Sequence, residues 1–397
     1  MCQAKEDGIH LLLEATSNQV NQAGGYTGMT PAMFRAYVYG IAAELNFDTS
    51  RLILGGDHLG PNPWQHLDAE TAMQHAAEMI RLYVEAGFTK IHLDASMRCA
   101  DDETIVPDVV MAGRAAALCS AAESARERLG LGPVVYVIGT EVPTPGGATH
   151  TLNELAVTSC EAAEQTLDVH RAAFHDASLE AAWERVIAVV VQPGVEFDHD
   201  SVIDYNAAKA RHLQVFLQEH PELVMEAHSS DYQRPEAYAE LIRDGFSILK
   251  VGPALTFALR ETLYALAAIE RELVTADKRS HLAETMEAIM LAHPADWRKY
   301  YRGDAGQQRL LRVYSYSDRI RYYWKFSEVE ASVSQLLHNL QLTGIPETLL
   351  SQYCPRQYDE IRAGRVKNDP ESIMIANVRT VLSGYSRACR AVSSATD

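Results

Sequence analysis

Residues 52–61 read LILGGDHLGP, a short apolar run that passes directly into a polar cluster containing Asp57 and His58. Six other apolar runs end in polar residues in the same way, and one of them, residues 223–228, ends in a second histidine. In a parallel β/α barrel, the carboxyl ends of the strands meet on one face and carry the active site. The pattern therefore predicts a ring of strands whose ends converge on one pocket.

Apolar runs and segments with helical spacing alternate along the chain. The predicted strands are residues 9–14, 52–57, 90–94, 134–139, 186–192, 223–228 and 247–251. In residues 68–86 the apolar side chains fall on one helical face and the charged ones on the other, and a similar repeat occurs in 254–273. Residues 187–191 are continuously apolar, which is typical of a strand covered on both faces.

This alternation allows either a closed barrel or a doubly wound open sheet. The open sheet predicts a glycine-rich phosphate turn after the first strand, and residues 19–25 do not form one. We therefore predict an α/β protein with a TIM (β/α)8 barrel over residues 1–324, a helical insertion at about 254–300 and an eighth strand at 310–316. Residues 325–397 are predicted to form a helical C-terminal extension packed on the barrel, as a cap or an oligomer contact.

The composition is that of a globular protein, because 47% of the 397 residues are hydrophobic. A net charge of −18 argues against a nucleic-acid partner, which requires a basic stripe, although a few local cations can still hold one sugar phosphate. The six cysteines lack CxxC spacing and fit free thiols in a reducing cytoplasm. No run approaches 18 apolar residues, so we expect a cytoplasmic protein without a membrane span or signal peptide.

Asp57 and His58 form the sharpest chemical signal in the chain. The imidazole could bind a divalent metal while the carboxylate moves a proton. The alternative is a capping aspartate and a structural histidine on a tight turn. His228, at the end of another strand, favours the metal site, because ligands in a barrel come from several strand ends.

Other strand ends add candidates, each with a local structural alternative. Glu141 could be a third metal ligand or an acid–base group, or it could simply be solvated. Asp94 and Ser96 offer a carboxylate and a hydroxyl to the pocket, or serve turn chemistry. Gln192 and Glu196 could bind substrate hydroxyls, and the alternative for Gln192 is a loop side chain paired to the backbone.

Further residues suit an anion or a polyol. Ser229 and Asp231 precede a predicted helix, and helix N-termini favour phosphate. Lys250 lies at a strand end. Ser317 and Arg319 belong to a run of hydroxyl, arginine and aromatic residues, for which the alternative is the capped start of an amphipathic helix.

Seven motifs, in order along nearly the whole chain, resemble the GatZ/KbaZ family of Z subunits associated with D-tagatose-1,6-bisphosphate aldolase. They are GGDHLGPNPW at 55–64, IHLDASM at 91–97, IGTEVPTPGG at 138–147, VQPGVEF at 191–197, EAHSSDYQ at 226–233, LKVGPALTF at 249–257 and YSYSDRIRYYW at 314–324. The resemblance implies a TIM barrel distantly related to class II, metal-dependent aldolases. In this family the Z subunit is described as a non-catalytic partner of a Y-type aldolase subunit in galactitol or N-acetylgalactosamine catabolism. Some members of the wider family are similar to metal-dependent ketohexose or ketohexose-phosphate 4-epimerases.

The resemblance to class II aldolases also implies individual roles. Asp57 falls at the place of the catalytic acid, while His58 and His228 fall at the places of two metal ligands. The third aldolase ligand, a histidine beside a glycine, is replaced by residues 192–194, and the Gly-Gly-Ser phosphate loop is replaced by residues 229–231. These departures argue against ordinary aldol cleavage and still permit a metal site.

Two functions remain open from the sequence. The first is a 4-epimerase of ketohexoses or ketohexose phosphates, with one Zn, Mn, Ni or Co ion at His58, His228 and Glu141 and with Asp57, Glu141 and Asp94 as catalytic carboxylates. The ion would stabilise an enediolate during C3–C4 cleavage, and re-addition to the rotated aldehyde would interconvert fructose-type and tagatose-type sugars. Hydride transfer at C4 is a rival route. The second function is a non-catalytic subunit that stabilises a Y-type aldolase, and a homo-oligomer is compatible with both.

Overall fold

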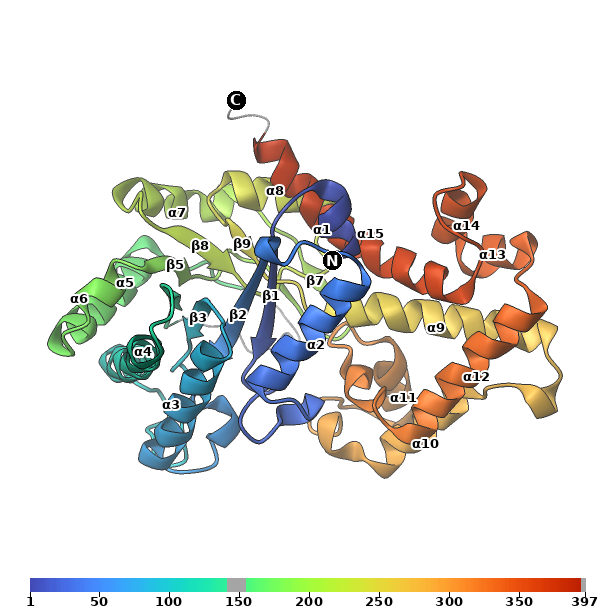
Figure 1. Ribbon diagram of the computed structural model, residues 1–397, viewed down its shortest axis with the longest axis horizontal. Helices are drawn as coiled ribbons and strands as arrows, with labels where there is room; N and C mark the ends of the chain where they lie inside the picture. Colours follow the sequence, from blue (N-terminus) through green and yellow to red (C-terminus); the bar gives the residue numbers. More distant parts are fainter. Residues whose placement is uncertain (141–154, 394–397) are drawn as a thin grey trace.

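Seven parallel strands form one curled sheet in the computed structural model of the chain, which describes residues 1–140 and 155–393 (Figure 1). The strands lie in the order β1 (Leu11–Thr16), β2 (Leu52–Leu59), β3 (Lys90–Leu93), β4 (Val135–Ile138), β5 (Val186–Val190), β8 (Val224–Ala227) and β9 (Ile248–Leu249). Every neighbouring pair is parallel. The seven predicted strands are thus confirmed, and their order excludes the reversal of a doubly wound sheet.

The predicted eighth strand is wrong. Residues 310–316 lie mostly in helix α11 (Ala305–Tyr314), which starts with a capping box between Asp304 and Gln307. Leu310 and Tyr314 are 50% and 55% exposed, whereas a barrel strand would bury such side chains. Within the described ranges β1 and β9 remain the two edges, so the sheet is a TIM-like half-barrel.

Helices cover the outer face of the sheet. They are α2 (Pro31–Glu44), α3 (Ala69–Glu85), α4 (Asp108–Leu129), α5 (Cys160–Asp176), α6 (Glu180–Trp183), α7 (Ala207–Glu219) and α8 (Pro235–Arg243) (Figure 1). Outward-facing strand residues such as Tyr136, Val189 and Met225 are fully buried against them in one hydrophobic core. A short antiparallel hairpin, β6 (Glu196–Phe197) and β7 (Val202–Ile203), follows β5.

A second hydrophobic core lies in a helical region beside the half-barrel. It is formed by α9 (Pro253–Leu273), α10 (Leu282–Ala292), α11, α12 (Ser327–Thr343), α13 (Glu347–Tyr353) and α14 (Pro355–Arg362). Its buried members include the large aromatic side chains of Trp297, Tyr301 and Tyr323. Residues 254–300 are therefore largely helical as predicted, but no strand follows them in residues 301–393. The proposed domain boundary at residue 324 stays a prediction.

The last helix, α15 (Pro370–Ser393), returns to the half-barrel and packs on α8, on α9 and on α1 (Cys2–Asp7) (Figure 1). Arg379 and Arg390 on α15 form ion pairs with Glu6 and Asp7 at the end of α1. The N-terminal helix α1 and the C-terminal helix α15 thus pack on each other beside the half-barrel.

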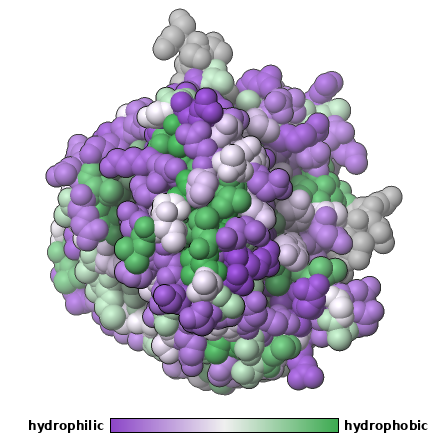
Figure 2. Space-filling view, turned by 90° about the vertical axis from the view of Figure 1, so that its right-hand side faces the viewer, coloured by the Kyte–Doolittle hydropathy of each residue, from purple (hydrophilic) through white to green (hydrophobic). Residues whose placement is uncertain are grey.

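The side of the molecule that carries the helical region shows an apolar strip among hydrophilic side chains (Figure 2). Helix α12 leaves Leu342 72% exposed, and α15 leaves Ile375 52% exposed. Among the described residues, no helix is both long enough and apolar enough to span a membrane.

Candidate functional site

The inner face of the half-barrel carries charged side chains. On β3, Ile91 and Leu93 point outward into the hydrophobic core, whereas Lys90 and His92 point inward and are buried. On β8, Glu226 lies on the same inner side. Because side chains alternate between the two faces of a strand, polar residues at every second position collect inside the half-barrel.

Asp57 and His58 both reach this interior because β2 contains an irregularity. The register between β2 and β3 shifts between Gly56 and Leu59, so that Asp57 and His58 lie opposite the single residue His92. A bulge of this kind turns neighbouring side chains toward the same side of a sheet. His58 accommodates it with a left-handed φ of 49°, which is uncommon for a residue other than glycine.

Two glycines of the same motif permit close packing around these residues. A Cβ atom at Gly60 would lie 1.6 Å from the carbonyl oxygen of Asp94, so only glycine lets the segment after β3 approach the end of β2. A Cβ atom at Gly55 would lie 2.6 Å from Glu14 Oε1. The glycines therefore bring two further carboxylates next to the Asp-His pair.

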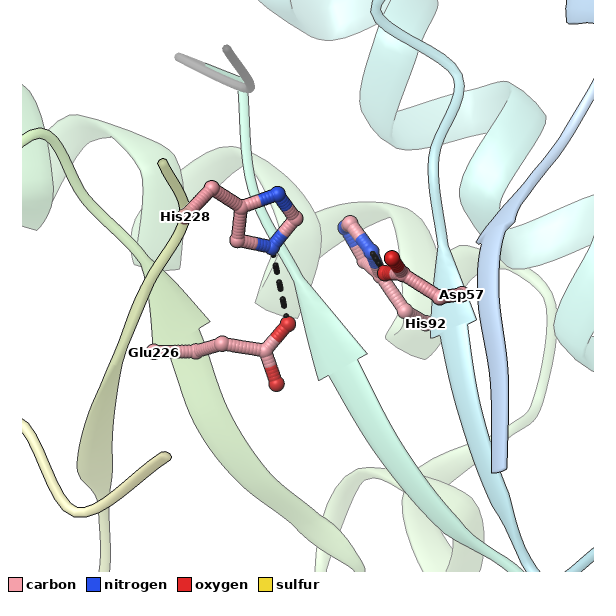
Figure 3. Close-up of side chains that lie close together, drawn as sticks. All are labelled: Asp57, His92, Glu226 and His228. Carbon is pink, nitrogen blue, oxygen red and sulfur yellow. Dashed lines mark hydrogen bonds and ion pairs between the residues drawn. The ribbon is translucent and has the colours of Figure 1, made fainter. Parts of the chain in front are cut away.

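Asp57, His92, Glu226 and His228 meet at the carboxyl ends of β2, β3 and β8, and we call them the ligand cluster (Figure 3). One candidate ligand atom of each lies within 4.8 Å of the others, and all four residues are buried. His92 Nδ1 is 2.9 Å from Asp57 Oδ1, and His228 Nε2 is 2.9 Å from Glu226 Oε1. Imidazole nitrogens and carboxylate oxygens are ligands that divalent transition metals accept.

His58 stands beside the ligand cluster and is held by Asp94. His58 Nδ1 is 2.8 Å from Asp94 Oδ2, and His58 Nε2 is 3.6 Å from Asp57 Oδ2. Asp94 also accepts hydrogen bonds from the backbone N–H and the hydroxyl of Ser96, which fix its carboxylate. Burial opposes a charge on His58, but Asp57 and Asp94 outweigh it and raise the pKa of the ring. An imidazole oriented by one carboxylate and facing another is suited to proton transfer.

Two lysines pair with the carboxylates of the interior. Lys90 Nζ lies 2.7 Å from both Glu14 Oε1 and Glu226 Oε2. Lys250 Nζ lies 3.0 Å from Asp57 Oδ1 and 3.3 Å from Glu226 Oε1, and it also bonds to Glu14. Lysines and carboxylates from five strands or strand ends therefore form one connected ion network.

The network shifts the pKa values of its members. Burial would raise the pKa of Asp57, but His58 and Lys250 outweigh it and hold that pKa well below its usual range. Burial also opposes the charge on Glu226, and the two lysines hold its pKa well below the usual range. Burial lowers the pKa of His228 to about 4. His228 is therefore a neutral imidazole at neutral pH, the form that binds metals.

A second set of buried carboxyl groups, which we call the rim carboxyls, consists of Glu196, Asp231 and Asp318. Burial raises their pKa values to about 7, about 6 and about 7, respectively. None of them forms an ion pair with another residue in the described ranges. Asp231 instead caps α9, because its Oδ1 accepts hydrogen bonds of 2.9 Å from the backbone N–H groups of Gly252 and Ala254. The helix whose N-terminus the sequence suggested for a phosphate is α8, which begins at Pro235, so Asp231 caps a different helix from the one that it precedes.

Residues 315–325 cross over segments that follow three of the strands. The Tyr232 hydroxyl, after β8, donates to the backbone of the segment at 2.7 Å. Lys325 donates to the carbonyl of Tyr26, after β1, at 2.6 Å. Thr256, at the start of α9 beyond β9, also hydrogen-bonds to the segment. We call residues 315–325 the crossing segment.

The ligand cluster fits a divalent cation on two counts. His92 Nε2 is buried and has no hydrogen-bond partner, which leaves a ring nitrogen for a ligand in a position where an unpaired polar atom is costly. The surrounding interior also holds more carboxylates than ammonium groups. The carboxylates are Glu14, Asp57, Asp94 and Glu226, and the ammonium groups are Lys90 and Lys250. A divalent cation would balance the difference.

Other predicted substrate-binding residues lie near the end of β5. The Gln192 amide oxygen accepts hydrogen bonds from the backbone N–H groups of Gly194 at 2.8 Å and Val195 at 3.1 Å. Gln192 thus has the backbone pairing that was its structural alternative. Glu196 accepts a hydrogen bond from Ser229, so these two predicted residues lie together.

Ser317 and Arg319 belong to the crossing segment and pack toward the helical region. Ser317 Oγ is 2.9 Å from Ser315 Oγ, and the Arg319 guanidinium stacks 3.4 Å from the ring centroid of Tyr300. No hydrogen bond or ion pair within the described ranges joins either residue to the ligand cluster. Glu141 lies outside the described residues.

His92 and Glu226 were missed as candidate ligands by the sequence reasoning. Both stand in predicted strands, and the run from Lys90 to Asp94 alternates polar and apolar residues. When one face of a strand is covered by helices, polar residues at every second position indicate that the other face lines a polar interior. That alternation was the available signal.

The model of the family described as D-tagatose-1,6-bisphosphate aldolase subunit GatZ/KbaZ-like matches residues 1–390. A crystal structure from Sinorhizobium meliloti 1021, described as a probable tagatose 6 phosphate kinase, is 49% identical to this chain. The match covers 98% of this chain and 96% of that chain, with a TM-score of 0.91.

Two more distant structures are a fructuronate-tagaturonate epimerase, UxaE, from Cohnella laeviribosi and a fructose-bisphosphate aldolase from Campylobacter jejuni. The epimerase is 14% identical, with 98% of this chain and 77% of that chain covered and a TM-score of 0.45. The aldolase is 11% identical, with 86% and 83% covered and a TM-score of 0.43. Neither likeness is high enough to carry a conclusion about this chain.

Proposed function

The chain belongs to the GatZ/KbaZ-like family of D-tagatose-1,6-bisphosphate aldolase subunits, and we propose that it is a divalent-metal-dependent 4-epimerase of ketohexoses or ketohexose phosphates. The observation that supports this proposal is the ligand cluster, in which two imidazoles and two carboxylates meet at the ends of three parallel strands. The strand ends are where active sites of parallel β/α folds lie. His228 keeps its predicted role as a ligand, and His92 and Glu226 join it.

His58 and Asp57 are placed to move a proton at the C4 oxygen of a ketohexose. His58 Nε2 and Asp57 Oδ2 lie 3.6 Å apart, and Asp94 fixes the orientation of the ring. Removal of the C4 hydroxyl proton converts C4 to an aldehyde while the C3–C4 bond breaks and its electron pair moves to the C2 carbonyl oxygen. When the bond re-forms on the other face of the rotated aldehyde, the proton returns to O4 and C4 is inverted. A divalent cation in the ligand cluster supplies the Lewis acidity that stabilises charge on the C2 oxygen.

An epimerase of this kind must retain the aldehyde between cleavage and re-addition. The crossing segment bonds to residues beyond β1, β8 and β9, and so covers part of the face on which the strands end. Exclusion of water and retention of the fragment are functions of such covers. This arrangement favours inversion at C4 over release of two products.

The test is an assay of the purified full chain for interconversion of fructose and tagatose, with parallel assays on the 6-phosphates and the 1,6-bisphosphates. We expect turnover with added Mn, Ni, Zn or Co, loss of turnover after chelation, and recovery when the metal is restored. Absence of turnover on every one of these sugars in the presence of each metal would contradict the proposal.

The second candidate function is a non-catalytic subunit that stabilises a Y-type aldolase. The lysine network favours it, because Lys90 and Lys250 already pair with Glu14, Asp57 and Glu226 inside the chain. Paired interior charges can serve the fold alone. A chain without turnover that restores the activity or thermal stability of a Y-type aldolase would establish this function in place of the first.

A further inference from the structure

Lys250 lies among the same carboxylates that would hold a metal ion. It is the first residue after β9, and its side chain points into the half-barrel. Its ammonium group is 3.0 Å from Asp57 Oδ1 and 3.3 Å from Glu226 Oε1. Both carboxylates belong to the ligand cluster, so the ammonium group occupies the side of the cluster where its negative charge is concentrated.

The contacted oxygens are also those that bind the two imidazoles. Asp57 Oδ1 is 2.9 Å from His92 Nδ1, and Glu226 Oε1 is 2.9 Å from His228 Nε2. One ammonium group therefore touches an oxygen in each half of the ligand cluster. A cation placed between the two halves would lie within a few ångströms of this ammonium group.

Lys90 differs from Lys250 in its partners. Lys90 Nζ bonds to Glu14 Oε1 and to Glu226 Oε2, at 2.7 Å each, and makes no ion pair with Asp57 within the described ranges. Lys90 therefore links Glu14 to Glu226, and it leaves Glu226 Oε1 free to contact His228 and Lys250. Lys250 bonds to Glu14 as well, so this carboxylate can keep the ammonium group when the other two are withdrawn.

We propose that Lys250 sets the metal affinity of the ligand cluster by competing with the divalent cation for Asp57 and Glu226. The inference rests on the proposed metal site. In the metal-free chain, the ammonium group neutralises the two carboxylates and keeps them in place. A divalent cation must displace it toward Glu14 and then bind against the repulsion of a neighbouring positive charge, which is strong where water is excluded. The site is therefore one that loads and exchanges its metal rather than one that keeps it permanently.

The test compares the Mn²⁺ and Zn²⁺ affinities of the wild-type chain, Lys250→Met and Lys250→Gln by isothermal titration calorimetry. Lys209→Met on α7, an exposed lysine outside the half-barrel, is the matched control. Removing the competing charge should tighten metal binding at least about tenfold in both Lys250 variants, since the interaction of two nearby charges exceeds this factor even at high effective dielectric. The control should stay within about twofold of the wild type.

Thermal unfolding gives an independent readout. Without metal, the Lys250 variants leave the buried carboxylates Asp57 and Glu226 with one cation fewer to balance their charge, and they should unfold at lower temperature than the wild type. Excess Mn²⁺ should raise their unfolding temperature by more than it raises that of the wild type, because the metal takes over the missing charge. Variants that fail to fold even with excess metal would contradict the inference.

The inference and the proposed function fail in different ways. Unchanged or weaker metal binding by both variants would overturn the inference while leaving intact a metal site that depends on His92 and His228. Absence of metal binding by the wild type and by both variants would overturn both. Binding by the variants with none by the wild type would support the competition between Lys250 and the cation, but it would overturn the proposed metal-dependent function of the native chain.

Discussion

The inner carboxylates Asp57, Asp94 and Glu226 and the rim carboxyls differ in one physical respect, although both sets are buried. The inner carboxylates have lowered pKa values because histidines and lysines outweigh the cost of burial. The rim carboxyls have raised pKa values because burial dominates and no described residue forms an ion pair with them. Buried carboxyl groups are thus charged at neutral pH in the inner set, whereas in the rim set they keep their proton to a pH close to neutral.

This difference distinguishes the inner carboxylates, which are charged and paired with lysines and histidines, from the rim carboxyls, which have no ion-pair partner among the described residues. Charged carboxylates and a neutral imidazole are the forms that ligate a metal. Carboxyl groups that retain a proton can donate hydrogen bonds to a polar ligand or to the fold without adding to the negative charge. The inner set is therefore the part of the molecule on which cation binding depends.

The largest effect is expected from removing either imidazole of the ligand cluster. His92→Ala and His228→Ala should each weaken divalent-metal binding by at least about 100-fold, because loss of even an outer partner of a metal ligand costs 10–100-fold. Metal content after dialysis and titration calorimetry measure this. His175→Ala, at a histidine whose side chain is 74% exposed on α5, is the control and should bind as the wild type does. Full metal content in both cluster variants would move the site elsewhere.

The next effect concerns the orientation of His58. Asp94→Asn removes the carboxylate that holds His58 Nδ1 at 2.8 Å but leaves the ligand cluster intact. We expect metal content to be retained and turnover to fall about 10²-fold, the scale of positioned acid–base catalysis. Asp168→Asn on the exposed side of α5 is the matched control. Turnover within a few-fold of the wild type would show that His58 does not carry the proton.

A smaller effect is expected from the rim carboxyls, and it concerns stability. The folded chain holds a proton on Asp318 up to about pH 7, whereas the unfolded chain releases it near pH 4. The free energy of unfolding therefore falls as the pH rises through this window, by on the order of 4 kcal/mol. Asp318→Asn, which tolerates the left-handed φ of 46° at this position, should abolish this part of the pH dependence.

Denaturant unfolding of the wild type and Asp318→Asn at several pH values measures the difference. The inner carboxylates act in the opposite direction, because their stabilisation is present above their usual pKa range and is lost as the pH falls below it. An identical slope for both proteins between about pH 4 and about pH 7 would contradict the raised pKa of Asp318.

The smallest effect is expected at Gln192. Its amide oxygen is engaged by the backbone of Gly194 and Val195, so Gln192→Ala should cost about 1 kcal/mol of stability. Because the Gln192 amide oxygen is bound by the backbone, its loss should remove little binding energy for the sugar. Turnover and KM for the sugar should therefore change by less than about threefold, which corresponds to less than about 1 kcal/mol. A much larger rise in KM would return Gln192 to the substrate-binding residues.

The half-barrel was predictable from the sequence because buried strands and covering helices have distinct periods. Residues 187–191 are continuously apolar and form β5, and the helical repeat of residues 68–86 forms α3. The helix that takes the place of the predicted eighth strand could not be recognised from apolar content alone. Asp304 and Gln307 signal a helix start, and Arg312 is buried in an ion pair with Glu287 and stacked on Trp297, contacts that only the fold supplies.

The site was predictable in part. His228 and Asp57 follow apolar runs, and the structure places both in the ligand cluster. His92 and Glu226 stand inside predicted strands and were not named as candidate ligands, because their roles depend on which face of the strand points inward. The partner of His58 could not be read from the sequence, because Asp94 approaches it only through the close contact at Gly60.

Anomalous X-ray scattering from crystals of the full chain grown with Mn²⁺ or Zn²⁺ tests the central claim most directly. The account predicts a single strong peak within about 2.0–2.2 Å of ligand atoms of His92, His228 and at least one carboxylate of the cluster, with Lys250 turned toward Glu14. A metal bound elsewhere in the chain, or ammonium contacts of Lys250 to Asp57 and Glu226 unchanged at saturating metal with no peak between the imidazoles, would contradict it.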